Sequence, residues 1–164
     1  MDESIHREVM KERRSSKTVD ATPEGAFQTW SDPLQLRTWW GPQGFTSREV
    51  VIEPREGGRF SVEMEDEDGR TFPMRGVFRE FDEPRRLVFT TSIIHDPTGG
   101  PPLEALNTIT FDERDGRTEI TWRWEAIDPA PTDIVSTSID GYEQTVADSL
   151  ARLAEVIART SGRP

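Results

Sequence analysis

The sequence of 164 residues contains no cysteine and only two histidines, His6 and His95. The lack of cysteine excludes disulfide bonds and thiolate metal ligands, and the two histidines are too far apart in sequence to form a metal-binding motif. No stretch reaches the ~18 apolar residues of a membrane span, and the polar start lacks the apolar core of a signal peptide. We therefore expect no metal, no cofactor, no membrane insertion and a cytoplasmic location.

Positive charge is also scarce, with 20 Lys and Arg residues against 31 Asp and Glu residues and a net charge of -11. A phosphate backbone or an anionic membrane surface would be repelled on average, so we expect no nucleic-acid partner. The length predicts a single domain over the whole chain, 1–164, with a core from about residue 9 to about residue 158. Neither an internal repeat nor a low-complexity linker divides it.

Two short helices are predicted in the first quarter of the chain. Thr22 and Asp32 each stand directly before a proline, which is the pattern of a helix N-cap followed by a first-turn proline. The second helix has to end within about two turns, because Gly41 suits a left-handed cap and Pro42 has no amide N–H to continue the helix.

Three tryptophans, Trp30, Trp39 and Trp40, surround this second helix. A helix so short is not stable alone and requires burial of its apolar side chains against a larger partner. We expect the three indole rings to pack in the core, filling a gap between a sheet and a long helix, although an aromatic wall of a ligand site is the alternative.

Alternating apolar and polar residues from Phe45 to about Ala126 predict six strands, and a further strand is expected before Ala21. Short turns between successive strands predict an antiparallel meander. Apolar residues at steps of three and four between Val135 and Ile157 predict a final helix of roughly 25 residues. One helix about 10 Å wide does not cover the apolar face of seven strands, so the two short helices cover the rest or the sheet encloses a space.

Several sequence runs carry a family resemblance. They are F-x-x-W-S-D-P-x-x-L-x-x-W-W-G-P-x-G-F at 27–45, P-R-E-G-G-R-F at 54–60 and E-P-x-R-L-V-F-T at 83–90. The chain from about Val9 to Ile157 resembles the family named for homology to the activator of the heat-shock protein 90 ATPase. That family lies within the START-like (SRPBCC) superfamily, which includes the major birch-pollen allergen, lipid-transfer domains and polyketide cyclases.

The resemblance implies an α+β helix-grip fold with a cavity between its layers. In that fold a curved seven-stranded antiparallel sheet wraps around a long C-terminal helix, and two short helices lie between strands 1 and 2. The function we expect first is non-catalytic binding of a small hydrophobic or amphipathic molecule in the cavity. The residues expected to line it are Phe27, Trp30, Trp39, Met74, Phe78, Phe89, Trp122, Tyr142 and Val146.

Tyr142 is of particular interest because its hydroxyl offers an apolar pocket one orienting hydrogen bond. The alternative is a core tyrosine whose hydroxyl reaches solvent or a backbone carbonyl. Gly141, directly before it, interrupts the predicted helix, and either close packing against the sheet or a ligand would explain it.

Two other functions stay open. One is an interaction protein that docks on a chaperone ATPase. The other is a cavity enzyme of the cyclase or hydrolase type, whose polar groups would come from Arg75, Glu80, Thr91 or Arg123. Strict alternation turns Glu80 inward unless a bulge reverses it. His95 is a further candidate base, whereas the acidic cluster at 63–68 is expected to be a solvated hairpin tip. Under any of these functions the chain is expected to be a monomer or a homodimer.

Overall fold

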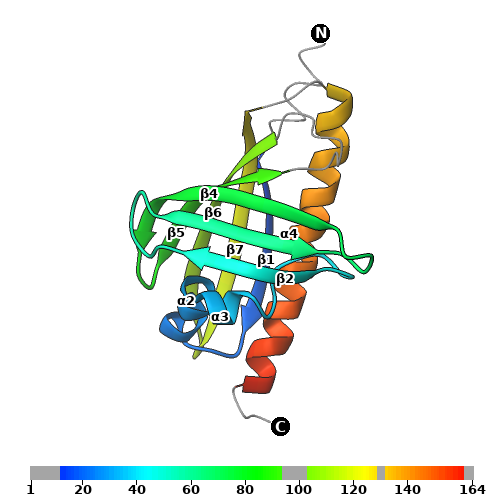
Figure 1. Cartoon of the computed structure of the whole chain (residues 1–164). Helices are drawn as coiled ribbons and strands as arrows, with labels where there is room; N and C mark the ends of the chain where they lie inside the picture. Colours follow the sequence, from blue (N-terminus) through cyan, green and yellow to red (C-terminus); the bar gives the residue numbers. More distant parts are fainter. Residues whose placement is uncertain (1–11, 94–102, 129–131, 161–164) are drawn as a thin grey trace.

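The computed structural model describes residues 12–93, 103–128 and 132–160. Seven strands and three helices form one α+β unit (Figure 1) within these ranges. In chain order they are β1 (Arg13–Val19), α2 (Pro23–Ser31), α3 (Pro33–Leu36), β2 (Thr46–Ile52), β3 (Arg59–Glu65), β4 (Thr71–Asp82), β5 (Arg86–Ile93), β6 (Leu103–Arg114), β7 (Arg117–Asp128) and α4 (Thr132–Thr160).

The strands form one antiparallel sheet in the order β1-β7-β6-β5-β4-β3-β2. Strands β2 to β7 therefore follow one another as a meander. Strand β1 pairs with β7 and forms the edge of the sheet opposite β2. The predicted meander and the additional first strand are both confirmed. Tight turns occur where glycine was expected to mark them: Gly57, Gly69 and Gly116 all have positive φ angles, of 77°, 83° and 82°.

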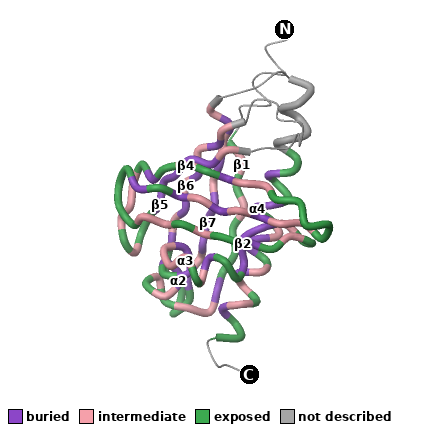
Figure 2. The backbone as a smooth tube through the Cα atoms, viewed as in Figure 1, coloured by how far each residue is buried: buried purple, intermediate pink, exposed green. Residues whose placement is uncertain are grey.

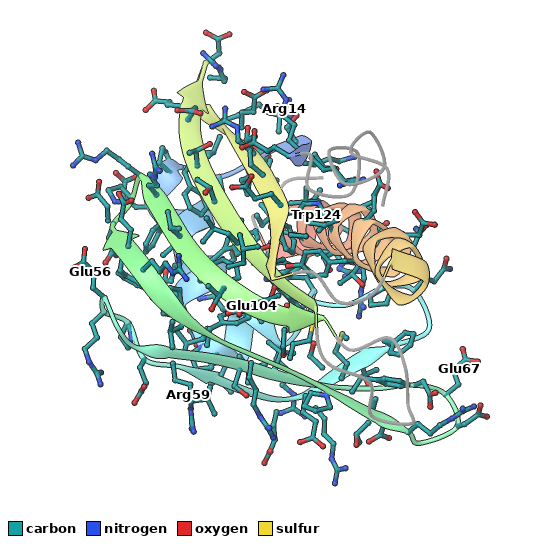
Figure 3. The ribbon with its side chains drawn as sticks, turned by 90° about the horizontal axis from the view of Figure 1, so that it is seen from above. Arg14, Glu56, Arg59, Glu67, Glu104 and Trp124 are labelled. Carbon is teal, nitrogen blue, oxygen red and sulfur yellow. The ribbon has the colours of Figure 1, made fainter. Side chains whose placement is uncertain are left out.

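The sheet is strongly curved and partly encloses α4. Seen from above in Figure 3, the strands bend around one side of the helix, and Trp124 lies between β7 and α4. Glu56 and Glu67 mark opposite ends of the β2–β4 part of the sheet in the same view. Buried residues lie along the middle of the strands, and buried and exposed residues alternate along the described part of α4 (Figure 2). The helix-grip arrangement expected from the sequence is confirmed.

The two short helices begin at the predicted caps. The Thr22 side chain accepts a hydrogen bond from the Gly25 N–H at 3.2 Å, and the Asp32 carboxylate accepts one from the Leu34 N–H at 2.9 Å. Each cap is followed by a proline, as the sequence predicts. The second helix is a single turn of four residues, and the backbone turns at Gly41 with a φ of 118°.

The segment after α3 is fastened to α4 by three side chains of the long helix. Ser149 accepts a hydrogen bond from the Gly41 N–H at 2.8 Å, and Asp148 accepts one from the Gln43 N–H at 2.9 Å. Arg152 donates from Nη1 to the carbonyl oxygens of Gly41 and Phe45 at 3.3 and 3.2 Å. These bonds fix the position of the tryptophan-rich segment relative to the helix.

Strands β4 and β5 approach each other unusually closely at Gly76. A Cβ atom at this position would overlap the carbonyl oxygen of Thr90. Beside it, the Val77 N–H donates to the Thr90 hydroxyl and the Arg75 N–H donates to the Ser92 hydroxyl, both at 3.0 Å. Glycine is therefore required at position 76, because a side chain there would push the strands apart.

Candidate functional site

The residues predicted to line a cavity all lie in the interior between the sheet and the helices. Each of them is at most 4% exposed, and all belong to one core cluster. They come from α2, the segment after α3, strands β4, β5 and β7, and α4. The structure thus places together side chains that are up to about 120 positions apart in sequence, namely Phe27, Trp30, Trp39, Met74, Phe78, Phe89, Trp122, Tyr142 and Val146.

Aromatic rings fill the part of this interior near α2 and α3. The ring centroid of Trp30 lies 4.6 Å from that of Trp39 and 5.0 Å from that of Trp122. The Trp40 ring lies 5.1 Å from Trp122 and 5.3 Å from Phe60. These are contact distances for tilted and edge-to-face aromatic pairs, so the tryptophans pack in the core as expected.

A closed ring of hydrogen bonds connects α4 to the sheet within this apolar interior. The Tyr142 hydroxyl donates to Asn107 Oδ1 at 2.6 Å, and Asn107 Nδ2 donates to Thr91 Oγ1 at 3.0 Å. Thr91 Oγ1 and the Tyr142 oxygen are 3.0 Å apart. Because the single Tyr142 proton is used toward Asn107, Thr91 is the donor in this third bond. We call these three residues the polar ring.

Asn107 is the centre of this arrangement. Its Nδ2 also donates to the Phe89 carbonyl oxygen at 3.2 Å, and its Oδ1 also accepts a hydrogen bond from Trp122 Nε1 at 3.0 Å. Both amide protons and both carbonyl lone pairs are therefore engaged, although the residue is fully buried. An amide satisfied in this way fixes the sheet and α4 in one relative position.

Burial has a strong electrostatic effect on Tyr142. It raises the pKa of the hydroxyl well above its ordinary value of 10.0, and the hydrogen bonds with Thr91 and Asn107 oppose only part of that rise. The hydroxyl is therefore neutral at physiological pH and acts as a hydrogen-bonding group. The hydroxyl reaches neither solvent nor a backbone carbonyl, because its partners are the side chains of Thr91 and Asn107.

The buried indole N–H groups of Trp30 and Trp40 differ from those of Trp39 and Trp122 in their hydrogen bonding. Trp39 Nε1 donates to the Thr29 carbonyl oxygen at 3.0 Å, and Trp122 Nε1 donates to Asn107. The Nε1 atoms of Trp30 and Trp40 are buried and have no hydrogen-bond partner within the described part of the chain. The rings of these two residues are neighbours, with centroids 6.3 Å apart and planes at 89°. They are two donors in an otherwise apolar region.

Asn107 is not predicted from the sequence as a residue of the site, although the sequence contains a pattern that indicates its inward position. It lies two and four positions before Ile109 and Phe111, which are buried on the inner face of β6. Strand periodicity places it on the same face. A polar residue in phase with buried apolar ones is the pattern that identifies such a site. For Thr91, the sequence suggests only the role of a polar group in a cavity enzyme.

Glu80 does not point into the interior, so its predicted inward direction is wrong. The pairing of β4 with β5 shifts between Phe78 and Glu80, and this bulge reverses the alternation. The Glu80 side chain is 39% exposed and forms an ion pair with Arg86 at 3.3 Å. Without this carboxylate, the enzyme interpretation loses the residue on which it mainly rested.

The remaining polar candidates also lie away from the polar ring. Arg75 is exposed, and Arg123 is half-buried on β7 between the inward-facing Trp122 and Trp124. His95 lies outside the described residues. Gly141 is exposed on α4, which fits neither of the two explanations given for it, close packing against the sheet or contact with a ligand in the interior.

The acidic hairpin tip is held by its own turn. Asp66 Oδ1 accepts hydrogen bonds from the backbone N–H groups of Asp68 and Arg70 at 3.0 and 2.9 Å. Arg70 also pairs with the Asp66 carboxylate at 3.4 Å.

Among the described residues, no group of three His, Asp or Glu side chains has the geometry of a metal site. In the same ranges, no helix is long and apolar enough to cross a membrane.

A curved antiparallel sheet around a long C-terminal helix defines a helix-grip protein. The family described as Activator of Hsp90 ATPase homolog 1-like protein matches residues 20–156, and the chain belongs to this family. Among curated proteins, the comparison finds no match.

Solved structures share the fold at low sequence identity. A protein from Chromobacterium violaceum is 23% identical with a TM-score of 0.73, covering 89% of this chain and 96% of its own. A protein from Rhodobacter sphaeroides is 21% identical with a TM-score of 0.74, covering 92% and 94%. An AHSA1 protein from Silicibacter pomeroyi is 20% identical with a TM-score of 0.71, covering 92% and 99%. These similarities support the architecture.

Proposed function

We propose that the chain binds a small hydrophobic or amphipathic molecule between the sheet and α4, without catalysis. The observation that carries this proposal is the pair of buried indole N–H groups of Trp30 and Trp40, which have no acceptor among the described residues. A buried donor without a partner costs roughly 1–3 kcal/mol, so an acceptor atom supplied by a ligand would remove an unfavourable term.

The surroundings of these donors define the rest of the ligand. The rings of Trp39, Phe60, Phe89 and Trp122 lie against Trp30 or Trp40, so the region around the donors is apolar. A ligand that matches it has an apolar body and at least one oxygen that accepts a hydrogen bond. The polar ring lies next to this region, since Trp122 contacts both Trp30 and Asn107.

The ring distances also indicate that the interior has to rearrange when a ligand binds. Neighbouring rings are already in contact, with the centroids of Phe60 and Phe89 only 4.5 Å apart. A ligand therefore has to separate side chains from one another or move α4 away from the sheet. We expect binding to change the packing of the tryptophans, which their fluorescence reports.

The proposal is tested by titration with Nile red, an uncharged dye that has an apolar body and a carbonyl acceptor. Met74 is buried on β4 and belongs to the same core cluster as Trp30 and Trp40, so Met74→Trp adds volume to the interior. We expect this substitution to weaken saturable dye binding by about tenfold, equivalent to ~1.4 kcal/mol. The control is Glu67→Ala in the exposed β3–β4 turn, which should bind the dye like the parent.

Overpacking at position 74 costs roughly 1–3 kcal/mol, so circular dichroism has to show that the variant is folded. Met74→Phe, a smaller change at the same position, provides a second variant if Met74→Trp does not fold. Equal dye binding by the parent, the interior variant and the Glu67→Ala control would place the dye outside the interior and contradict the proposal.

A further inference from the structure

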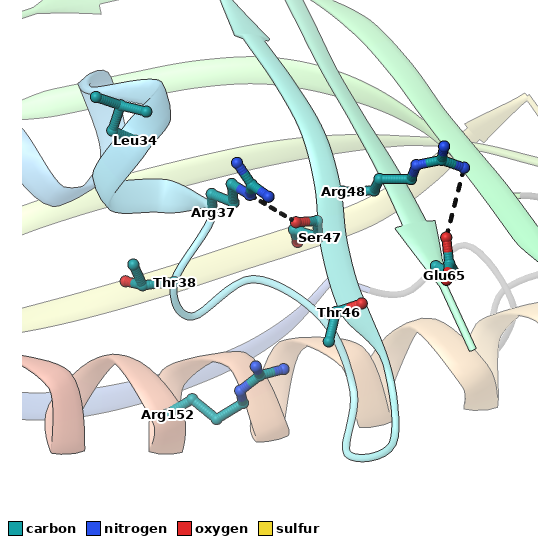
Figure 4. A pocket seen from close by; sticks show the side chains of 8 residues that line it. All are labelled: Leu34, Arg37, Thr38, Thr46, Ser47, Arg48, Glu65 and Arg152. Atoms are coloured by element: carbon teal, nitrogen blue, oxygen red, sulfur yellow. Dashed lines mark hydrogen bonds and ion pairs between the residues drawn. The ribbon is translucent and has the colours of Figure 1, made fainter. Parts of the chain in front are cut away.

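A surface pocket separate from the aromatic interior lies where α3, β2, β3 and α4 meet (Figure 4). Its volume is about 800 Å³, within the range of small-molecule sites. The residues that line it are Leu34, Arg37, Thr38, Thr46, Ser47, Arg48, Glu65 and Arg152. None of the nine residues assigned to the interior site is among them.

The charge of this pocket is opposite to that of the whole chain. Three of its lining residues are arginines, Arg37, Arg48 and Arg152, and the only acidic one is Glu65. The chain as a whole has a net charge of -11. Three arginines from three separate segments therefore line one pocket of a strongly acidic protein. In Figure 4, Arg37 lies near Ser47, and Arg48 extends toward Glu65. Such a concentration of positive charge attracts anions locally.

Two of the arginines are held by backbone carbonyl groups. Arg37 donates from Nε to the Ser47 carbonyl oxygen at 3.3 Å, and Arg152 uses Nη1 to bond Gly41 and Phe45. A carbonyl orients a guanidinium group but does not neutralise its charge. Each arginine has five N–H donors, so both groups retain N–H donors for a ligand.

The third arginine is paired, but loosely. Arg48 Nη1 lies 3.5 Å from Glu65 Oε2, and the two side chains are 60% and 35% exposed. Exposed pairs of this kind contribute ~0.2–1 kcal/mol, so an anion in the pocket competes readily with Glu65. The single carboxylate of Glu65 therefore lowers the affinity of the pocket for an anion but does not prevent binding.

An apolar side chain lies beside the charged groups. Leu34 is 74% exposed on α3 and forms part of the pocket lining. Thr38, Thr46 and Ser47, which carry hydroxyl groups, complete the lining. A ligand that fits this combination has both an anionic group and an apolar group.

We propose that this pocket is a second binding site, which takes an organic oxyanion: a phosphate monoester or a carboxylate joined to an apolar group. Planar guanidinium groups match the geometry of phosphate and carboxylate oxygens, with two N–H donors toward two oxygens. Arg37, Arg48 and Arg152 bind the oxyanion, and Leu34 contacts the apolar part.

Calorimetric titration with phenyl phosphate and with benzoate at low salt tests the site. Arg37→Gln and Arg48→Gln each remove one charge and should weaken binding roughly two- to fivefold, the range of an exposed charge interaction. Glu65→Gln should have the opposite effect and strengthen binding, because it removes the competing carboxylate. The matched control is Arg85→Gln, since Arg85 is an exposed arginine paired with Asp82 outside the pocket.

Saturable binding of either probe with this pattern of variants supports the site, and the interior variant Met74→Trp should leave it unchanged. The absence of binding for both probes would overturn the proposal. So would equal binding by Arg37→Gln, Arg48→Gln and the Arg85→Gln control. Inorganic phosphate that binds as tightly as phenyl phosphate would remove the apolar part of the assignment.

Discussion

Tyr142 is the only tyrosine of the chain, so tyrosinate absorbance reports on this residue alone. Burial raises the pKa of its hydroxyl above the ordinary value of 10.0. In the unfolded chain the same group ionises near pH 10. The neutral, buried hydroxyl therefore contributes its full stability below about pH 10, and that stability is lost as the pH rises through the raised pKa.

We predict that an alkaline titration of the folded protein shows no tyrosinate absorbance at pH 10. The signal should appear only at higher pH, together with the loss of tertiary structure measured by near-ultraviolet circular dichroism. The same titration in concentrated urea should show ionisation near pH 10. Tyrosinate formation near pH 10 in a protein that stays folded would show that the hydroxyl of Tyr142 is accessible to water.

Asn107 offers a second test on the scale of one residue. Asn107→Ala removes one hydrogen bond each from the Tyr142 hydroxyl, the Trp122 N–H and the Phe89 carbonyl. We expect the free energy of unfolding to fall by roughly 2–5 kcal/mol, measured by urea denaturation.

The matched control for Asn107 is Thr108→Ala. Thr108 is the next residue of β6, half-buried on the opposite face of the strand. Its loss should cost less than about 1 kcal/mol. Similar urea midpoints for the two variants would mean that the polar ring does not hold α4 to the sheet.

At the scale of elements, α3 illustrates how a single turn of helix is stabilised. It has four residues, too few for stability by itself, and its position depends on the buried side chains around it. Trp40 is fully buried against Phe60 and Trp122. We predict that Trp40→Ala lowers the free energy of unfolding by ~3–5 kcal/mol, as expected for truncation of a buried aromatic ring.

Leu34→Ala on the same helix is the control for Trp40→Ala. Leu34 is 74% exposed, so its truncation should change the free energy of unfolding by less than about 0.5 kcal/mol. Both variants are compared with the parent by chemical denaturation. A midpoint for Trp40→Ala close to that of Leu34→Ala would contradict the role of Trp40 as the anchor of this segment.

The elements were predictable because each has a local cause. A cap before a proline starts both short helices, glycines with positive φ form the turns, and alternation identifies the inner face of the sheet. The bulge beside Glu80 has no such local signal, because it depends on how β4 and β5 pair. A shift of one residue reverses every side chain that follows, so alternation alone placed Glu80 on the wrong face.

The polar ring shows a similar limit for the site. Tyr142 was identified as a hydrogen-bonding residue from its position on α4, but its partners lie on β5 and β6. Which side chains of a curved sheet meet a helix depends on curvature and register, and neither is encoded in a short window of sequence. The two indole groups without partners likewise emerge only from three-dimensional packing.

On the scale of the whole molecule, curvature gives the sheet an inner face that α4 alone does not cover. In Figure 1, α2 and α3 lie at the lower end of the sheet, beside the C-terminal half of α4. Side chains from both short helices and from the segment after α3 belong to the same core cluster as those of α4. The helix-grip fold thus concentrates large aromatic side chains in one interior, and our proposed function depends on that interior opening to a ligand.

The indole N–H region of a ¹⁵N NMR spectrum tests this central claim most directly, because the chain has only five tryptophans. Trp30→Phe and Trp40→Phe assign the signals of the two N–H groups that lack partners. Upon saturation with Nile red, we predict downfield shifts of both signals, while the signal of Trp39, already bonded to Thr29, moves little. Saturating dye that leaves the Trp30 and Trp40 signals in place would contradict ligand binding in the interior.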